Sequence, residues 1–256
     1  MRPGARIWAA IEVLEDIAGR HRPAATALGD WGRMHRFAGS GDRAAIGTLV
    51  FDALRHRNSL AWRMGSDAPR ALAVAAAPGA LGISSEELEG LADGSEYGIA
   101  PLSSEETAGL ARSVPDDAPL YIAADIPEWL AASFEEAFGD RAVAEGRALS
   151  ERAPIDLRVN GLKATREKVL RALSRFAPEP TSLSPLGVRI AAPLGGGKAP
   201  NVEADGAHGK GWFEVQDEGS QIAALIAGAL AREQVLDLCA GAGGKTLAMA
   251  AGMQNT

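Results

Sequence analysis

The residues best suited to do chemistry lie between Val235 and Ala250, in the segment VLDLCAGAGGKTLAMA. An apolar, β-rich run ends at Leu238, a turn of small residues follows, and the next residues have a helical pattern. A glycine turn between a strand and a helix lets a ligand approach the backbone, and the N-terminus of the helix offers free N–H groups. The spacing therefore predicts a nucleotide-type binding site at this turn.

The type of ligand follows from the residues around the turn. Gly244, Lys245 and Thr246 resemble the end of a Walker A sequence, but the first glycine of that pattern would fall at Cys239. Asp237 stands in the strand, where a carboxylate repels phosphate. The pattern therefore favours a cationic, hydroxyl-bearing ligand such as a sulfonium cofactor. A phosphate-binding loop and a turn with only a structural role remain alternatives.

Four motifs in a fixed order carry a family resemblance. They are IPEWL at 126–130, LRVNGLK at 157–163, FEVQDEGSQ at 213–221 and DLCAGAGGKT at 237–246. Together they resemble the RNA (cytosine-5) methyltransferases of the Sun/nucleolar-protein family, whose bacterial members modify 16S ribosomal RNA. Residues 1–125 match only loosely, in the pattern of a helical RNA-binding extension. The family more often has Ala-Pro where this chain has Gly241 and Ala242.

The resemblance implies S-adenosyl-L-methionine as cofactor, bound by Cys239, Ala240, Gly241, Ala242, Gly243, Gly244 and Lys245. Thr246 would stabilise the helix that follows. Cytosine-5 enzymes attack C6 of the base with a thiolate. Cys239, however, is expected at the end of a buried strand without nucleophilic duty, and the family's two cysteine motifs are absent. We therefore expect no catalytic residue in this chain, and expect the chain to be an inactive N-terminal fragment of the enzyme.

The elements needed to position this turn change character along the chain. Helical spacing predicts helices near 5–17, 25–36, 42–64, 68–77, 84–91, 103–112, 128–138 and 141–150. Beyond residue 150 the pattern predicts strands at 155–159, 188–191, 212–215 and 235–238, with helices at 165–176 and 217–231. The glycine-rich stretch 194–211 is predicted to be a loop or a loose hairpin.

The predicted fold class is α + α/β. It comprises an all-α RNA-binding-like domain (1–125), a small α/β RNA-positioning segment (126–211) and the incomplete start of a Rossmann-like methyltransferase sheet (212–256). Trp8, Trp31, Trp62 and Trp129 lie on apolar helix faces and are expected in the core. Trp212, beside Gly209 and Gly211, is more open to a function.

The charge distribution indicates where RNA could bind. Residues 1–70 carry 11 Arg against 7 acids (+4), residues 71–150 carry 3 basic against 15 acidic residues (−12), and residues 151–256 carry 12 against 11 (+1). Arginine suits phosphate contacts, although solvated helix faces explain the pattern equally well. The candidate RNA contacts are Arg33, Arg36, Arg43, Arg55, Arg57, Arg158 and Lys163. A non-catalytic helical RNA-binding module is the alternative function, and a P-loop nucleotide-binding protein is another.

The composition indicates no disulfide framework, metal site or membrane span. A single cysteine excludes an internal disulfide framework, and the four scattered histidines predict no metal site. No apolar run approaches the roughly 20 residues of a membrane span. We therefore expect a cytoplasmic protein, a monomer by default. The family resemblance implies RNA, specifically 16S ribosomal RNA, as its partner.

Overall fold

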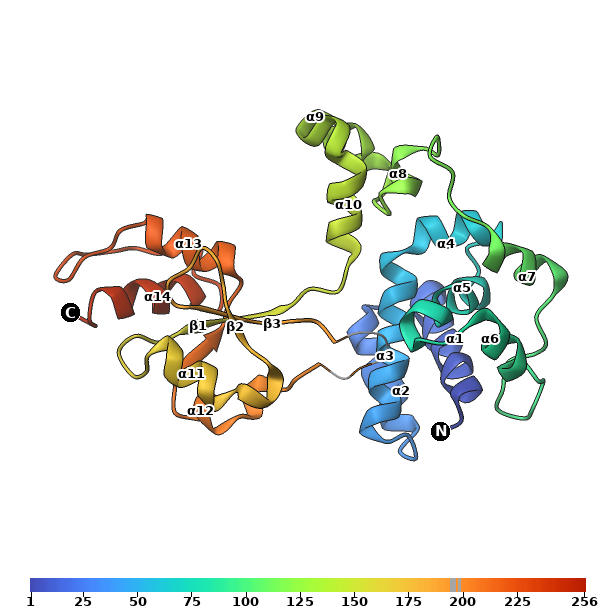
Figure 1. Cartoon of the computed structure of the whole chain (residues 1–256), viewed down its shortest axis with the longest axis horizontal. Helices are drawn as coiled ribbons and strands as arrows, with labels where there is room; N and C mark the ends of the chain where they lie inside the picture. Colours follow the sequence, from blue (N-terminus) through green and yellow to red (C-terminus); the bar gives the residue numbers. More distant parts are fainter. Residues whose placement is uncertain (194–196, 198) are drawn as a thin grey trace. The chain divides into compact units, whose positions relative to one another are not determined.

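The structure is a computed structural model that describes residues 1–193, 197 and 199–256. By its internal contacts the chain forms two units (Figure 1). Unit 1 contains Met1–Glu151 together with Pro193 and Gly197, and unit 2 contains Arg152–Ala192 and Ala199–Thr256. The three-segment organisation expected from the sequence places its boundaries elsewhere and remains a prediction.

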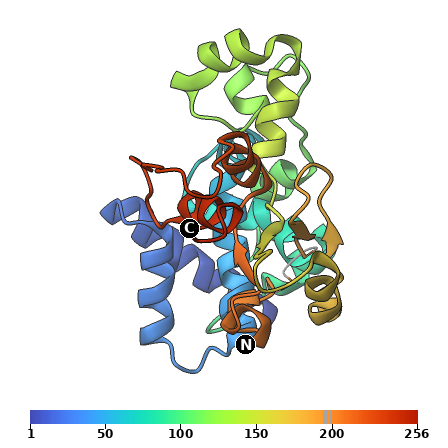
Figure 2. The same ribbon diagram turned by 90° about the vertical axis from the view of Figure 1, so that its left-hand side faces the viewer.

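The regular secondary structure of unit 1 is all helical in its described residues. Its helices are α1 (Pro3–Arg20), α2 (Ala24–Met34), α3 (Ser40–Arg55), α4 (Arg57–Met64), α5 (Pro69–Leu81), α6 (Ser85–Leu91), α7 (Ser104–Ala111), α8 (Leu120–Ala123), α9 (Ala131–Phe138) and α10 (Ala142–Ser150), with 3₁₀ turns η1 (Glu128–Leu130) and η2 (Gly139–Arg141). Helix α10 contacts both α8 and α9 (Figures 1 and 2).

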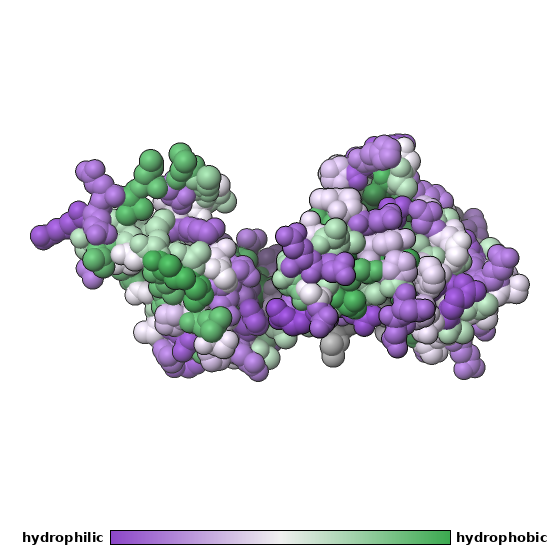
Figure 3. Space-filling model, turned by 90° about the horizontal axis from the view of Figure 1, so that it is seen from above, coloured by the Kyte–Doolittle hydropathy of each residue, from purple (hydrophilic) through white to green (hydrophobic). Residues whose placement is uncertain are grey.

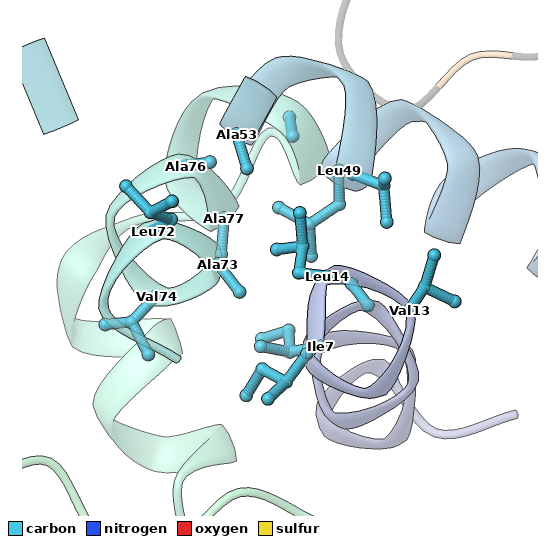
Figure 4. Close-up of a cluster of buried hydrophobic side chains, with 14 of the residues drawn as sticks. Ile7, Val13, Leu14, Leu49, Ala53, Leu72, Ala73, Val74, Ala76 and Ala77 are labelled. Atoms are coloured by element: carbon cyan, nitrogen blue, oxygen red, sulfur yellow. The ribbon is translucent and has the colours of Figure 1, made fainter. Parts of the chain in front are cut away.

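The core of unit 1 forms where α1, α3 and α5 pack together. Ile7, Leu14, Leu49 and Ala73 are buried and point toward one another (Figure 4). The small residues along α5 bring its backbone close to its neighbours, so that a dense apolar interior forms from short side chains. The helical spacing of apolar residues therefore predicted the core of this unit correctly.

Two helices of unit 1 begin at serine caps. Ser84 and Ser103 each form a capping box, in which the hydroxyl accepts from the N3 backbone and the N3 glutamate accepts from the serine N–H. Two expectations are wrong. The single helix at 42–64 is divided at His56, because Asp125 accepts hydrogen bonds from the backbone N–H and hydroxyl of Ser59. Trp129 and Trp62 are 79% and 42% exposed rather than in the core.

Gly146 lies where α10 packs on α8, and its lack of a side chain is needed there. A Cβ at this position would lie 2.6 Å from the Ala124 Cβ and 2.7 Å from the Ala124 carbonyl oxygen. Gly146→Ala should lower the free energy of unfolding by about 1–3 kcal/mol. Gly19→Ala in α1 meets no atom within 4 Å and should raise it by about 0.5–1 kcal/mol. Urea denaturation measures both; an unchanged midpoint for Gly146→Ala contradicts this packing.

Unit 2 is built on one small sheet. Its elements are β1 (Ile155–Val159), α11 (Arg166–Ala172), η3 (Ser174–Phe176), β2 (Glu179–Pro180), β3 (Gly187–Ile190), η4 (Val202–Ala204), α12 (Gly206–Gly209), β4 (Phe213–Val215), α13 (Glu218–Ile226) and α14 (Gly244–Gly252). The strand order is β2-β3-β1-β4 and every pairing is antiparallel. In the register of the sheet, Leu157 faces Val188 on one side and Val215 on the other.

The two faces of β1 differ in character because successive side chains point to opposite faces of a strand. Leu157 and Val159 enter an apolar core with Val169, Leu173 and Phe213. Asp156 and Arg158 lie on the other face, where α13 contacts the strand. Helices α13 and α14 lie side by side (Figures 1 and 2). The polar face of the sheet is therefore covered by a helix instead of water.

Three of the predicted strands are formed, and the helix at 165–176 appears as α11 followed by η3. The stretch expected to be a loop contains η4 and α12, while residues 194–196 and 198 lie outside the described residues. The chain is thus a mixed α and β protein, as expected. In the part of the chain that the structure describes, no helix has the length and apolarity that a bilayer crossing requires.

The prediction of a strand at 235–238 is wrong. These residues have no strand conformation, and Leu236 and Leu238 are each 87% exposed. A strand of this kind must pair its backbone and bury its side chains, and no strand of the described residues lies beside it. Apolar side chains consequently reach the surface of unit 2, where green residues gather in Figure 3.

Candidate cofactor turn and basic surface

Residues 239–243 form one open turn, and Gly244 and Lys245 are the first residues of α14. Gly241 and Gly243 have φ values of 55° and 83°, in the left-handed region that favours glycine. A Cβ on either of them would meet no atom within 4 Å. The Gly243 N–H donates to the Ala240 carbonyl at 2.8 Å, and the Leu247 N–H donates to the Gly243 carbonyl at 2.8 Å. No side chain of the described residues fills the space beside these two glycines.

Side chains on either side of the turn form a hydrogen bond with each other, and Gln216 lies beside Gly244. The Thr246 hydroxyl donates to the Asp237 carboxylate at 2.7 Å, which ties the start of α14 to the residues before the turn. Gly244 faces Gln216, because a Cβ on Gly244 would lie 3.3 Å from the Gln216 side-chain nitrogen. Cys239, expected at the end of a buried strand, is exposed, because the strand that would bury it does not form.

Gln216 connects this turn to the sheet. Its side-chain oxygen accepts from Arg158 Nε at 2.6 Å, and its backbone oxygen accepts from Gln221 Nε2 at 2.8 Å. The Ser184 hydroxyl donates to the Gln221 side-chain oxygen at 2.7 Å. These four side chains are buried, so a polar network lies behind the Gln216 side chain that Gly244 faces.

A second part of the network holds the start of α13. The Asp156 carboxylate accepts from Arg189 Nε and Nη2, each at 2.7 Å, and from the Glu218 N–H at 3.1 Å. Glu218 Oε1 accepts from the backbone N–H groups of Leu183 and Ser184 at 2.8 and 2.9 Å. Asp217 caps the helix through the Ser220 N–H, as the sequence indicates. The burial of Glu218 was not predicted from the sequence, although FEVQDEGSQ, which contains it, was one of the four family motifs.

Glu218 makes the stability of unit 2 depend on pH. Hydrogen bonds from the Thr181 hydroxyl and from the Ser184 and Leu183 N–H groups hold the pKa of Glu218 below its usual value. Its contribution is therefore present above the unfolded pKa, about 4.3, and is lost as the pH falls through the lower folded pKa. As the pH is lowered from 6 to 3, the melting temperature of wild type should fall further than that of Glu218→Gln. An equal fall in melting temperature for the two proteins would contradict this role of Glu218. The control variant Glu203→Gln, at an exposed site, should show the same fall as wild type.

Four of the candidate arginines in unit 1 already have partners. Arg33, Arg55 and Arg57 form ion pairs with Asp30, Asp52 and Asp67, and Arg43 Nε donates to the Ala38 carbonyl at 2.9 Å. Arg36 is exposed. The structure does not bring these five side chains to a single site, and their role in RNA binding remains a prediction.

Arg158 differs from the prediction for it. The side chain was expected to contact RNA phosphate, but the residue is only 4% exposed and bonds to Gln216. Burial lowers the pKa of its guanidinium from the usual value, an effect that nearby Glu214 opposes. The reason is its place on the helix-covered face of β1, which a single sequence does not reveal. Arg158 therefore does not offer its charge to a phosphate at the surface.

Lys163, the remaining candidate, belongs to a basic surface around an aromatic ring. Lys168 Nζ lies 3.9 Å and Lys210 Nζ 5.1 Å from the centroid of the Trp212 ring. Lys163 Nζ lies next to Gly211, where a Cβ would be 2.8 Å from it. We call these four residues, Lys163, Lys168, Lys210 and Trp212, the Trp212 surface. Sequence reasoning singled out Lys163 and Trp212 but missed the two lysines beside the ring, which come from separate segments.

The described residues contain no group of three or more His, Cys, Asp or Glu side chains arranged to hold a metal ion.

Comparison with known proteins relates the sheet of unit 2 to a described domain. Residues 126–195 match the ferredoxin-like domain of RsmF/B-like methyltransferases. A probable ribosomal RNA small subunit methyltransferase B of Synechocystis sp. is 32% identical over 47% of this chain and 26% of its own length. The ribosomal RNA small subunit methyltransferases B of Photorhabdus laumondii and Pectobacterium carotovorum are 33% and 34% identical, each over 47% of this chain and 27% of their own length.

A solved structure shares the fold. The crystal structure of PH0851 superposes with a TM-score of 0.62 and 19% identity, over 100% of this chain and 62% of that chain. The matched part of this chain spans about a quarter of the length of the curated relatives. These matches confirm the family resemblance that the four motifs indicated.

Proposed function

The chain carries the ferredoxin-like domain of the RsmF/B-like methyltransferases, and from this relationship we propose that it serves S-adenosylmethionine-dependent methylation of cytosine C5 in 16S ribosomal RNA. The observation that carries the proposal is the open turn at Cys239–Lys245, joined through Gln216 to the domain that the relatives share. In this proposal residues 212–256 begin a Rossmann-like methyltransferase domain.

The proposed cofactor fits the chemistry of the turn. Gly241 and Gly243 leave the backbone accessible, and the N-terminus of α14 directs N–H groups toward the turn. Cys239, Ala240, Gly241, Ala242, Gly243, Gly244 and Lys245 would hold S-adenosylmethionine, which supplies the methyl group when bound. The Asp237 carboxylate, held by Thr246, suits a cofactor that carries positive charge.

The catalytic thiolate is not among these 256 residues in this proposal. Cytosine C5 becomes reactive when a cysteine adds to C6, and Cys239, the one cysteine of the chain, lies in the cofactor turn. The chain instead contributes one wall of the cofactor site and a surface for RNA. The target cytosine must be single-stranded or turned out of its stack to be reached.

RNA would contact unit 2 at the Trp212 surface. Lysines bind phosphate as point charges, and an aromatic ring accepts a stacked base. Lys168 and Lys210 lie over a half-buried indole, and Lys163 lies beside the preceding Gly211. A phosphate contact and a stacking contact are therefore available close together. This surface replaces Arg158 as the proposed phosphate contact of unit 2.

The test is genetic and chemical. The gene is deleted in the source organism, and 5-methylcytosine in 16S ribosomal RNA is mapped by bisulfite sequencing. Loss of methylation at one cytosine, restored by the intact gene, is expected. An unchanged map would overturn the proposed function. A restoring gene with Gly243→Val should fail to restore methylation, because a β-branched residue is strained at φ 83°, while Gly79→Ala, which meets no atom within 4 Å, should restore it.

A further inference from the structure

Arg158 is a buried cation whose hydrogen-bonding capacity is mostly unused. Its Nε donates to Gln216, and its two terminal nitrogens form no hydrogen bond or ion pair with any residue that the structure describes. Glu214, the cross-strand partner of Arg158 on β4, is too distant to form an ion pair with it. A buried charge of this kind is costly unless an opposite charge or further acceptors compensate it.

The other acidic groups near this face are already engaged. Asp156 accepts two hydrogen bonds from Arg189 and one from the Glu218 N–H, and Glu218 accepts from two backbone N–H groups. Glu214 lies 3.8 Å from His208. None of these three carboxylates neutralises Arg158 directly.

A cavity of about 170 Å³ has Arg158 in its lining. Its walls come from β1 and the turn after it, from the residues before β3, and from α13 and α14. Apart from Arg158, the polar side chains in its lining are Ser184 and Gln221, and these bond to each other and to the Gln216 backbone. The remaining walls are glycine and aliphatic side chains, among them Leu186, Leu225 and Met249.

We propose that this cavity binds a monocarboxylate with a short aliphatic chain, its carboxylate on the Arg158 guanidinium and its chain against α13 and α14. The planar fork of arginine matches a carboxylate through two parallel N–H···O bonds. One cation balances one negative charge, whereas a phosphate dianion would need further donors that the apolar walls do not supply. The inference does not rest on the proposed methyltransferase function.

The experiment uses the intact chain and sodium butanoate as probe, with sodium chloride at equal ionic strength and inorganic phosphate as comparisons. We expect butanoate to raise the melting temperature in a saturable way beyond the effect of chloride, and to shift the Arg158 Nε–H resonance in ¹⁵N spectra. Butanoate equal to chloride in both measurements overturns the proposal. A larger saturable effect of phosphate overturns the assignment to a carboxylate.

Variants separate binding from folding. Arg158→Met should abolish the butanoate effect, and Arg171→Met, at an exposed position of α11, should retain it. Arg158→Lys keeps the charge but loses the planar fork, so its butanoate affinity should fall about tenfold. If Arg158→Met does not fold, the lysine variant and the Arg158 resonance decide the question. A full butanoate effect in either Arg158 variant overturns the proposal.

Discussion

Phe213→Ala should lower the free energy of unfolding of unit 2 by about 3–5 kcal/mol, the usual cost of deleting a buried phenylalanine side chain. Phe213 is fully buried and is the largest of the fully buried side chains. It lies on β4 and packs with Leu157, Val159 and Val169 in the apolar core of that unit. A small core has few other contacts to compensate for the cavity, so we expect this to be the most destabilising of the variants considered.

The measurement is urea denaturation, with unfolding monitored by hydrogen exchange of the β1 amides, which report on unit 2 alone. Phe213→Leu should cost less, because a leucine fills part of the space. Trp129→Ala removes a larger ring that is 79% exposed and should leave the unfolding free energy within about 0.5 kcal/mol of wild type. If Phe213→Ala and Trp129→Ala cost the same, the core of unit 2 is not as described.

The triple variant Lys168→Ala, Lys210→Ala, Trp212→Ala should weaken RNA binding by about 10- to 100-fold. Loss of a stacked base costs about 1–3 kcal/mol, and each lysine removed takes away a phosphate contact. The two ammonium groups lie 3.9 and 5.1 Å from the Trp212 ring centroid, so a base and the adjoining phosphates could engage all three side chains together.

Filter binding or fluorescence anisotropy with a single-stranded 16S ribosomal RNA fragment, at several salt concentrations, measures the effect. The slope of log K against log salt should decrease in magnitude by about 1.4, or 0.7 for each lysine. Arg20→Ala with Arg141→Ala removes the same charge from exposed positions of unit 1 and should leave affinity and slope nearly unchanged. If the control variant weakens binding as much as the triple variant does, only net charge matters and the Trp212 surface is not the contact.

The sequence was sufficient wherever the interactions are local. Ser84, Ser103 and Asp217 cap their helices as their types and spacing indicate. The alternation of Ile155 to Val159 predicts β1, and the small residues after Leu238 predict the open turn. These features depend on neighbours within a few positions, because hydrogen bonds to adjacent backbone groups and side-chain alternation decide them.

Tertiary structure decided whatever depends on distant partners. Arg158 looks like a phosphate ligand in the sequence, yet α13 covers its face of the sheet and buries it. The run Val235–Leu238 has the composition of a strand and forms none, because no neighbouring strand pairs with it among the described residues. Lys168 and Lys210, 42 positions apart, meet over Trp212 only in the folded unit. Burial and strand pairing are cooperative properties of the packed chain, so residue type alone cannot determine them.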